Sequence, residues 1–258
     1  EIYTLSLHDA LPIYDIRLGI IEEVSLDDLK DNPGFYSRFF LVPKRGLDEY
    51  GNTRWRSVLD LSKLNKHIHI PRFRMETPES IRSVLMPDEW TTSIDLSDAY
   101  HHIAIHPDFR RYLRFVYNGR VFQYAAMPMG LSVSPWAFTR VLFPLRKYMH
   151  SRGIRLHQYL DDWLVRTSSI DDANRDLNFV LHVTKQLGSI INYPKCDLTP
   201  TQSFQFLGYH FNSVTQTITP PSNRWEKLQP LLTTFQAATA LQARTWLQLI
   251  GCLVALTK

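Results

Sequence analysis

Short apolar or alternating segments, bounded by turn-forming residues, recur along the chain and predict β-strands. Two of these strands flank Asn118 and Gly119, a pair typical of a two-residue hairpin turn. Two others flank Asp161 and Asp162, which we expect to form a tight connection because Asp tolerates turn conformations that β-branched residues avoid. The predicted strands span 39–42, 55–60, 90–95, 101–105, 112–117, 120–124, 154–160 and 163–165.

Helices are predicted where apolar residues recur every three or four positions after a capping residue. Thr77 and Ser134 each precede a proline, which is typical of an N-cap followed by the first helical position. Ser169 opens another helix whose first turn carries two Asp residues, a charge that suits a helix N-terminus. The predicted helices include the end of one at 18–24 and span 77–85, 134–153, 170–187, 225–235 and 246–253. Strands and helices together predict an α+β fold.

The composition narrows the classes of function. With 258 residues, 44% of them hydrophobic, the chain can bury a core in one large domain or two small lobes. Cys196 and Cys252 form neither a CxxC pair nor a ligand cluster, which argues against a zinc site or a disulfide framework and fits a reducing compartment. The sequence has no apolar run long enough to predict a membrane span. A formal charge of +4 is compatible with a polyanionic partner without specifying one.

Residues 1–13, EIYTLSLHDALPI, are unlike the start of a domain or a secretory signal, because no basic leader precedes the short apolar run. Back-translated, this string resembles a common short-read sequencing adapter. We therefore expect residues 1–13 to be an assembly artefact and the fold to begin near Tyr14. The alternative is a genuine N-terminal arm.

Asp161 and Asp162 stand out because an apolar, β-prone stretch surrounds them, where burial would normally exclude charge. A hard divalent cation held by carboxylates and substrate phosphates would explain the pair, whereas a solvated Asp-Asp turn is the alternative. A further carboxylate, Asp95, ends the predicted strand 90–95. If the strands pair, Asp95 and Asp161 meet at one edge of a sheet, where two metal ions about 4 Å apart can be bridged.

Basic residues accompany the predicted hairpin over 39–60. Lys44 and Arg56 are suited to neutralise a triphosphate, and a solvated hairpin is the alternative. His67 and His69 have a spacing that metal sites use, although a strand face is the more common origin of such a pair.

Five segments, in this order along the chain, resemble the motifs of reverse transcriptases. The first segment, residues 55–66, is similar to a motif of the polymerase fingers. The last, residues 204–211, is similar to the FLG strand before the primer grip. The similarity covers roughly residues 18–215. The amino-acid sequences of the motifs most resemble those of the DIRS group of tyrosine-recombinase retrotransposons. The segments are WRSVLDLSKLNK (55–66), IDLSDAY (94–100), AAMPMGLSVSPWAF (125–138), YLDD (159–162) and FQFLGYHF (204–211).

This resemblance implies a right-hand polymerase, with fingers, an antiparallel palm sheet backed by helices, and the start of a helical thumb. The implied fingers comprise 14–89 and 107–132, and the implied palm comprises 90–106 and 133–219. Residues 220–258 would begin the thumb or connection. Related elements usually carry an RNase H domain, which we expect in a longer parent polyprotein and not in this chain.

The resemblance also implies an activity, namely DNA synthesis from dNTPs on a primed RNA or DNA template. Asp95, Asp161 and Asp162 would be the catalytic carboxylates, and together with the carbonyl of Leu96 they would hold two Mg²⁺ ions, for which Mn²⁺ can substitute. The family pattern places Lys44, Arg56, Tyr100 and Met129 on the incoming nucleotide and Lys195 as a general acid.

Some of these roles have alternatives. Met129 departs from the glutamine of retroviral enzymes, which puts hydrogen bonding to the sugar in doubt and leaves a packing role. Tyr100 read alone fits a core tyrosine, and Lys195 read alone fits an exposed lysine. The alternative to an enzyme is a catalytically inactive fragment that binds nucleic acid. A different class of Mg²⁺-dependent phosphotransferase is disfavoured, because the sequence contains no P-loop motif. We expect an intracellular protein, in the cytoplasm or nucleus.

Overall fold

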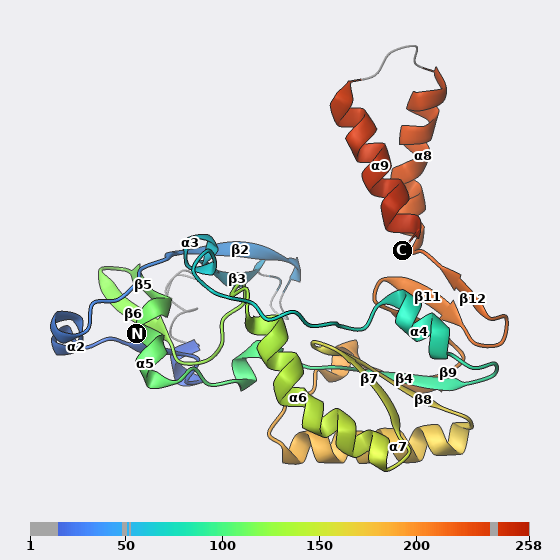
Figure 1. Cartoon of the computed structure of the whole chain (residues 1–258), viewed down its shortest axis with the longest axis horizontal. Coiled ribbons are helices and arrows are strands. Elements are labelled where there is room, and N and C mark those ends of the chain that lie inside the picture. Colours follow the sequence, from blue (N-terminus) through green and yellow to red (C-terminus); the bar gives the residue numbers. More distant parts are fainter. Residues whose placement is uncertain (1–14, 48–50, 52, 238–241, 258) are drawn as a thin grey trace. The chain divides into compact units, whose positions relative to one another are not determined.

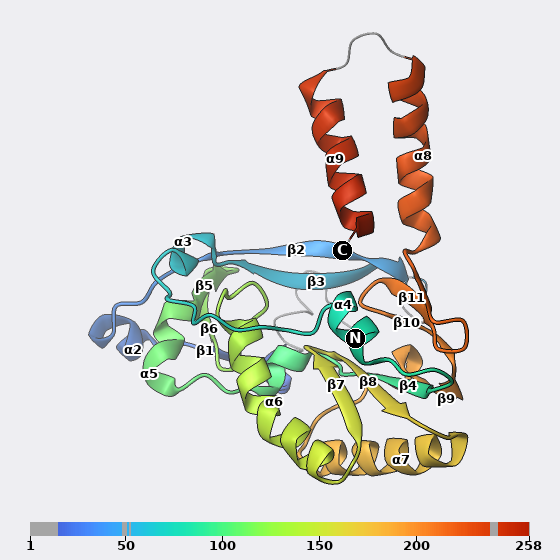
Figure 2. The ribbon, with the colours of Figure 1, turned by 45° about the vertical axis from the view of Figure 1, so that its right-hand side comes forward.

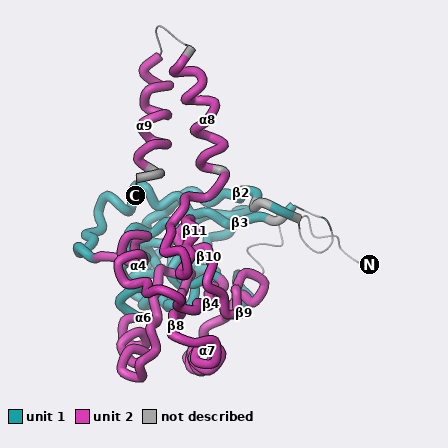
Figure 3. The backbone as a smooth tube through the Cα atoms, turned by 90° about the vertical axis from the view of Figure 1, so that its right-hand side faces the viewer, with its two compact units in different colours: residues 1–73, 98–142 teal, residues 74–97, 143–258 magenta. Residues whose placement is uncertain are grey.

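A computed structural model describes residues 15–47, 51, 53–237 and 242–257. The chain divides into two compact units, one made of residues 1–73 and 98–142 and the other of residues 74–97 and 143–258 (Figure 3). Helix α6 (Ser134–Ser151) contains the third of the three boundaries between them along the chain. Helices occur together with antiparallel sheets, so the predicted α+β class is confirmed.

The first unit is built from a three-stranded antiparallel sheet, in the order β1-β6-β5, and the long hairpin β2–β3. Asn118 and Gly119 both have positive φ and join β5 to β6, as the sequence predicts. Phe39 of β2 stacks on the buried Phe115 of β5, with ring centroids 4.4 Å apart. The elements are β1 (Ile21–Glu23), α2 (Leu26–Asp31), β2 (Arg38–Leu47), β3 (Thr53–Asp60), α3 (Ser62–Asn65), η1 (Ala99–His102), α5 (Pro107–Arg110), η2 (Arg111–Leu113), β5 (Arg114–Tyr117) and β6 (Arg120–Tyr124).

Two predictions for this unit are wrong. Residues 18–24 do not end a helix, because residues 21–23 form β1 against β6, where burial of Ile21 outweighs the local helical pattern. Residues 101–105 do not form a strand. The left-handed conformation of Asp98, at φ 46°, leads instead into the short 3-10 helix η1, and only Ala104 makes an isolated bridge, to Ala126.

The second unit contains a four-stranded antiparallel sheet, in the order β7-β8-β4-β9, and a smaller sheet in the order β10-β11-β12 (Figure 1). Thr77 caps α4 with a reciprocal capping box, and Ser169 caps α7, as predicted. The elements are α4 (Pro78–Val84), β4 (Trp90–Asp95), β7 (Arg155–Tyr159), β8 (Asp162–Thr167), α7 (Ile170–Gln186), η3 (Tyr193–Lys195), β9 (Asp197–Thr201), β10 (Ser203–Phe206), β11 (Tyr209–Asn212), β12 (Thr217–Thr219), α8 (Ser222–Ala237) and α9 (Ala243–Thr257).

The four-stranded sheet has two differently covered faces. Leu164 of β8 packs on one face in a cluster with Ile81 of α4 and aromatic residues of β10 and β11. Because side chains alternate along a strand, Trp163 and Val165 point to the opposite face. Helix α7 packs against β8 and β4 and lies along one side of the sheet (Figures 1 and 2). The sheet therefore separates a helix-covered face from the face that carries Asp162.

The last two helices form an antiparallel pair. Phe235 of α8 meets Trp246 of α9 edge to face, with ring centroids 4.5 Å apart, and Leu228 and Leu249 are buried. In the part of the chain that the structure describes, no helix has both the length and the apolar character needed to cross a bilayer.

Candidate active site

The hairpin β7–β8 carries two of the candidate carboxylates, and its turn differs by one residue from the predicted turn. Leu160 and Asp161 form the connection, and Asp162 is the first residue of β8. Leu160 has a φ of 53°, a conformation that a leucine rarely adopts. The indole N–H of Trp163 donates to the Leu160 carbonyl at 2.8 Å, which fixes the turn. The strained turn therefore rests on a buried side chain.

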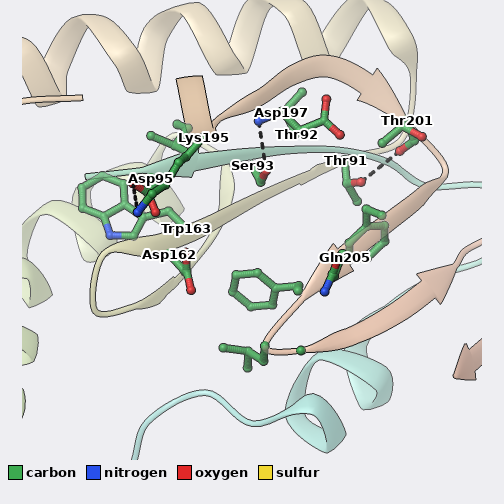
Figure 4. A pocket seen from close by; sticks show the side chains of 15 residues that line it. Thr91, Thr92, Ser93, Asp95, Asp162, Trp163, Lys195, Asp197, Thr201 and Gln205 are labelled. Carbon is green, nitrogen blue, oxygen red and sulfur yellow. Dashed lines mark hydrogen bonds and ion pairs between the residues drawn. The ribbon is translucent and has the colours of Figure 1, made fainter. Parts of the chain in front are cut away.

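Strand register brings Asp95 directly opposite Asp162 (Figure 4). The N–H of Leu96 donates to the carbonyl of Asp161 at 3.0 Å, so the neighbouring pair Asp95 and Asp162 is the non-hydrogen-bonded one, in which side chains approach most closely. We expected Asp161 to meet Asp95. The register instead gives that position to Asp162 and leaves Asp161 one residue away, at the turn.

The Asp95 side chain is held by residues of the segment that leads into β9. Asn192 donates its amide N–H to Asp95 Oδ1 at 2.7 Å, and Lys195 Nζ lies 3.7 Å from the same oxygen. The Asp95 backbone N–H donates to Cys196 Sγ at 3.2 Å. Sequence reasoning identified Lys195 but missed Asn192 and Cys196. Their polar side chains beside Pro194 were the available signal, yet nothing local points to Asp95.

The carboxylates of this site repel one another. Burial, followed by the negative charges of Asp161 and Asp95, raises the pKa of Asp162 to about 6, against the opposing charge of Lys195. Among the described residues, no three His, Cys, Asp or Glu side chains are grouped so that they could hold a metal ion by themselves. A cation at this site therefore needs further oxygen ligands from a backbone carbonyl or a substrate, which is the way Mg²⁺ is usually bound. The mutual repulsion of Asp95 and Asp162 fits such a cation.

A cavity of about 360 Å³ opens beside these carboxylates, between the four-stranded sheet and the turn that joins β10 to β11 (Figure 4). Asp95, Asp162 and Lys195 are among its lining residues, together with Gly208 of the turn. Hydrogen bonds from Asp197 N–H to Ser93 Oγ and from Thr91 Oγ1 to the Thr201 carbonyl join β4 to β9 along this cavity. The β10–β11 turn of the smaller sheet therefore lies across the cavity from Asp95 and Asp162, which we call the acidic strand ends.

Comparison with known proteins identifies this arrangement. The family model described as "Reverse transcriptase (RNA-dependent DNA polymerase)" matches residues 42–211, which is more than half of the chain. The chain belongs to the reverse transcriptase family. The match includes both acidic strand ends and the β10–β11 turn.

Curated relatives of this chain include a viral protein and polyproteins of a virus and a transposon. Protein P of duck hepatitis B virus (strain China) is 26% identical over 82% of this chain, which spans 27% of that protein. The Gag-Pol polyprotein of walleye dermal sarcoma virus is 27% identical over 82% of the chain, and the Tf2-3 polyprotein of Schizosaccharomyces pombe is 27% identical over 61%. The chain spans 12% of the length of each of these two polyproteins.

Solved structures of foamy viral protease-reverse transcriptase share the fold. The complex with double-stranded DNA superposes with a TM-score of 0.74 at 20% identity, covering 98% of this chain and 49% of that one. The complex with an RNA/DNA hybrid gives a TM-score of 0.70 at 20% identity, covering 97% and 31%. The predicted right-hand polymerase fold is confirmed, and the exact boundaries of fingers, palm and thumb stay a prediction.

A buried ion network braces the β7–β8 hairpin of this reverse transcriptase domain. Arg166 of β8, which is 4% exposed, pairs with Glu89 and donates its Nε–H to His157 Nε2 at 3.0 Å. His157 Nδ1 lies 3.3 Å from Glu76, whose pKa falls to about 2 chiefly because of that histidine. Arg155 adds a second pair to Glu89 at 2.8 Å. The network ties both strands of the hairpin to the segment that contains α4.

The predicted nucleotide-binding residues belong to the first unit. Arg56 is exposed on β3, and Met129 is 39% exposed just before Gly130. Tyr100 lies in η1, with its ring edge to face against Phe138 at 5.7 Å. The backbone of Lys44 is part of β2, but its side chain lies outside the described residues. Residues 1–13 also lie outside them.

Asn65 is a residue of this unit that sequence reasoning did not single out. Its side chain donates to the Gly130 carbonyl at 2.9 Å and accepts from the N–H of Ser132 at 2.9 Å. These two bonds fix the loop that begins at Met129. The signal was available in the segment 55–66, where Asn65 stands in the part that resembles the fingers motif.

Proposed function

We propose that this domain performs template-directed DNA synthesis, transferring nucleotides from dNTPs to a primer 3′-hydroxyl. The observation that carries the proposal is the non-hydrogen-bonded pair Asp95 and Asp162, with Asp161 in the adjacent turn. Membership of the reverse transcriptase family supports it, and the presence of all three carboxylates favours an enzyme over an inert fragment.

Asp95, Asp161 and Asp162, helped by the Leu96 carbonyl, would hold two Mg²⁺ ions, with Mn²⁺ as a substitute. Bound divalent cations supply the positive charge that lowers the pKa of an attacking hydroxyl and offsets the charge of a departing pyrophosphate. Asn192 orients Asp95 for this role through its hydrogen bond. Lys195, near Asp95 and 66% exposed, would give a proton to the pyrophosphate.

Four residues of the first unit would bind the nucleotide. Arg56 and Lys44 would pair with the triphosphate, because guanidinium and ammonium groups suit phosphate oxygens. The Tyr100 ring would lie under the sugar and exclude a 2′-hydroxyl by overlap. Met129 would pack against the nucleotide from the loop that Asn65 fixes.

The relatives support a proposal for the partners. The foamy viral enzyme was solved with double-stranded DNA and with an RNA/DNA hybrid, which supports a primed RNA or DNA template here. Because the relatives are polyproteins, we propose that a longer parent protein carries further domains such as RNase H. We place its action inside the cell, in the cytoplasm or nucleus.

The finer origin of the sequence is also a proposal. The amino-acid sequence of residues 127–138 and 159–165 supports assignment to the DIRS group. A search of the source genome for a tyrosine recombinase reading frame beside this one would test the assignment. The adapter-like string supports an artefactual origin for residues 1–13. Amplifying the genomic locus across that junction would test this origin, and a genomic match to the string would refute it.

Primer extension tests the proposed activity. The chain is incubated with poly(rA)/oligo(dT) and dTTP, with Mg²⁺, with Mn²⁺ or with a chelator. We expect extension that requires the divalent cation, and loss of extension in Asp95→Asn and Asp161→Asn with the fold intact, because a neutral amide cannot replace a charged ligand. Binding of the primed template without extension in the unmodified chain would instead support the inert, nucleic-acid-binding fragment.

A further inference from the structure

Two stretches of the chain carry cations without any acidic residue. Residues 109–160 contain nine Arg or Lys and no Asp or Glu, and residues 177–196 also lack acids. Helix α6 and the C-terminal part of α7 come from these stretches. Some of their cations are neutralised from elsewhere, since Arg146 pairs with Glu76. Helix α6 therefore has a local excess of positive charge.

Lys147 and Arg152 belong to this excess. Both residues are exposed, and within the part of the chain that the structure describes, neither has a carboxylate at ion-pair distance. The Arg152 guanidinium lies over the ring of Tyr148, 5.1 Å from its centroid, and over that of Phe179 of α7, at 5.4 Å. These cations are thus free to meet an anion, and one of them is already seated on aromatic rings.

Exposed aromatic rings accompany the cations. Tyr148 is 41% exposed, and its ring lies beside that of the half-buried Phe179 of α7, with centroids 6.3 Å apart. Lys147 and Tyr148 lie near the C-terminal end of α6, and Arg152 directly follows the last helical residue, Ser151. We call the set Lys147, Tyr148, Arg152 and Phe179 the α6 face. It presents ring surface and positive charge at the C-terminal end of α6.

The α6 face is separate from the candidate active site. Asp162 and Leu164 lie on the sheet face opposite Trp163 and Val165, and α7, which supplies Phe179, packs against the sheet away from the cavity (Figures 1 and 4). A ligand of the α6 face is therefore not one that occupies the acidic cavity.

We propose that the α6 face binds single-stranded nucleic acid, in addition to the primed template at the active site. Exposed cations with no carboxylate at ion-pair distance attract phosphates, and exposed rings stack on unpaired bases whatever their identity. An acidic peptide would use the charges but leave the rings without partners. A duplex would hide its bases from them. The combination favours a single strand bound without sequence preference.

The test measures binding of a labelled poly(U) oligonucleotide to the full chain by fluorescence anisotropy, with and without excess unlabelled RNA/DNA primer-template. We expect binding that persists when the primer-template is present. The double variant Lys147→Glu/Arg152→Glu should weaken it by about tenfold or more and lower the salt dependence. Tyr148→Leu should weaken it by about fivefold or more, whereas Tyr148→Phe keeps the ring and should stay near the unmodified value.

The matched control is Lys30→Glu/Arg82→Glu, which makes the same change of net charge at exposed positions on α2 and α4. This control should bind poly(U) within about twofold of the unmodified chain, and all variants should retain primer extension and thermal stability. Equal losses in the two double variants, equal effects of Tyr148→Leu and Tyr148→Phe, or tighter binding of a poly(Glu) peptide would overturn the proposal. Asp95→Asn separates the two functions, because it should lose extension and keep poly(U) binding.

Discussion

Individual side chains far apart in sequence decide how the acidic site is held. Asn192 and Asp95 are separated by 97 positions, yet their side chains form a 2.7 Å hydrogen bond. Asp95 is 7% exposed, so this bond and its neighbours replace solvation of the carboxylate. Orientation of Asp95 is therefore a property of the segment that leads into β9 as much as of β4.

Replacing Asn192 by Ala should lower the catalytic rate. A hydrogen bond to a charged group contributes about 1.5–3 kcal/mol, which corresponds to a loss of about tenfold or more in kcat/KM for primer extension. The matched control is Asn174→Ala on the exposed side of α7, which should keep its activity. An unchanged rate in Asn192→Ala would show that Asp95 is oriented without it.

Tyr100 tests selection of the sugar. If its ring excludes a 2′-hydroxyl by overlap, Tyr100→Ala should admit ribonucleotides, while Tyr100→Phe should keep the discrimination because the ring remains. The measurement is the ratio of kcat/KM for dNTP and rNTP on one template. An equal fall for both substrates in Tyr100→Ala, with an unchanged ratio, would leave only packing against Phe138 as its role.

The hairpin β7–β8 is the element on which the site depends most. Its turn contains Leu160 in the left-handed region, and the hydrogen bond from Trp163 maintains that conformation. At its other end, Arg166 and His157 connect the two strands to Glu89 and Glu76. The hairpin is thus fixed at both ends by side chains, and backbone pairing with β4 fixes its length.

Changing Leu160 separates backbone strain from packing. A β-branched residue suits a φ of 53° less than leucine does, so Leu160→Val should destabilise the domain by about 1–2 kcal/mol. Leu160→Gly should be neutral or slightly stabilising, because glycine adopts positive φ readily. Urea unfolding measures both variants. Equal stability of the Val and Gly variants would mean that the turn relaxes.

The ion network makes stability depend on pH in the acid range. The pKa of Glu76 is lowered to about 2 in the folded chain, from an ordinary value of 4.5, by His157 and then by Ser80 and Arg146. Because the pKa of Glu76 is lower in the folded chain than in the unfolded chain, its carboxylate stabilises the fold above pH about 4.5. This stabilisation is lost as the pH falls toward about 2. Glu76→Gln should therefore be less stable than the unmodified chain at pH 6 and approach it at low pH.

Thermal unfolding measured at a series of pH values tests this expectation. Glu79→Gln is the matched control, because Glu79 is exposed in the first turn of α4, three residues after Glu76. The control should follow the unmodified chain at every pH. A constant difference between Glu76→Gln and the unmodified chain over the whole acid range would contradict the assigned pKa shift.

At the scale of the whole molecule, the net charge and the family membership both favour binding of nucleic acid through its phosphates. The chain carries a formal net charge of +4, and the reverse transcriptase family model covers 42–211. A polymerase must accept any template sequence, so its affinity for a primed template has to come mainly from phosphates. Affinity of that origin depends strongly on salt and weakly on sequence.

Binding of primed templates should therefore weaken steadily as salt rises, with a linear relation between log K and log salt. Templates of equal length and different sequence should bind with affinities within about threefold of each other, since base edges are not read. Anisotropy titrations at several salt concentrations measure both properties. A flat salt response, or a strong preference for one sequence, would contradict phosphate-directed binding.

The sequence by itself determined the features that depend on neighbouring residues. Thr77 and Ser169 begin helices because their side chains accept hydrogen bonds from N–H groups three residues ahead. Asn118 and Gly119 join two strands because both tolerate positive φ. The order of the five motifs and the position of Asp95 at a strand end were likewise readable, and they led to the family.

Only the tertiary structure decided the features that depend on distant partners. Residues 21–23 are a strand because β6 offers an edge to pair with, which no local pattern records. Asp162, not Asp161, lies opposite Asp95 because strand register is set by the whole β4–β8 ladder, and a shift of one residue changes which side chain faces the site. Asn192 and the network from Glu89 to Glu76 are contacts across long sequence separations, so packing alone brings them together.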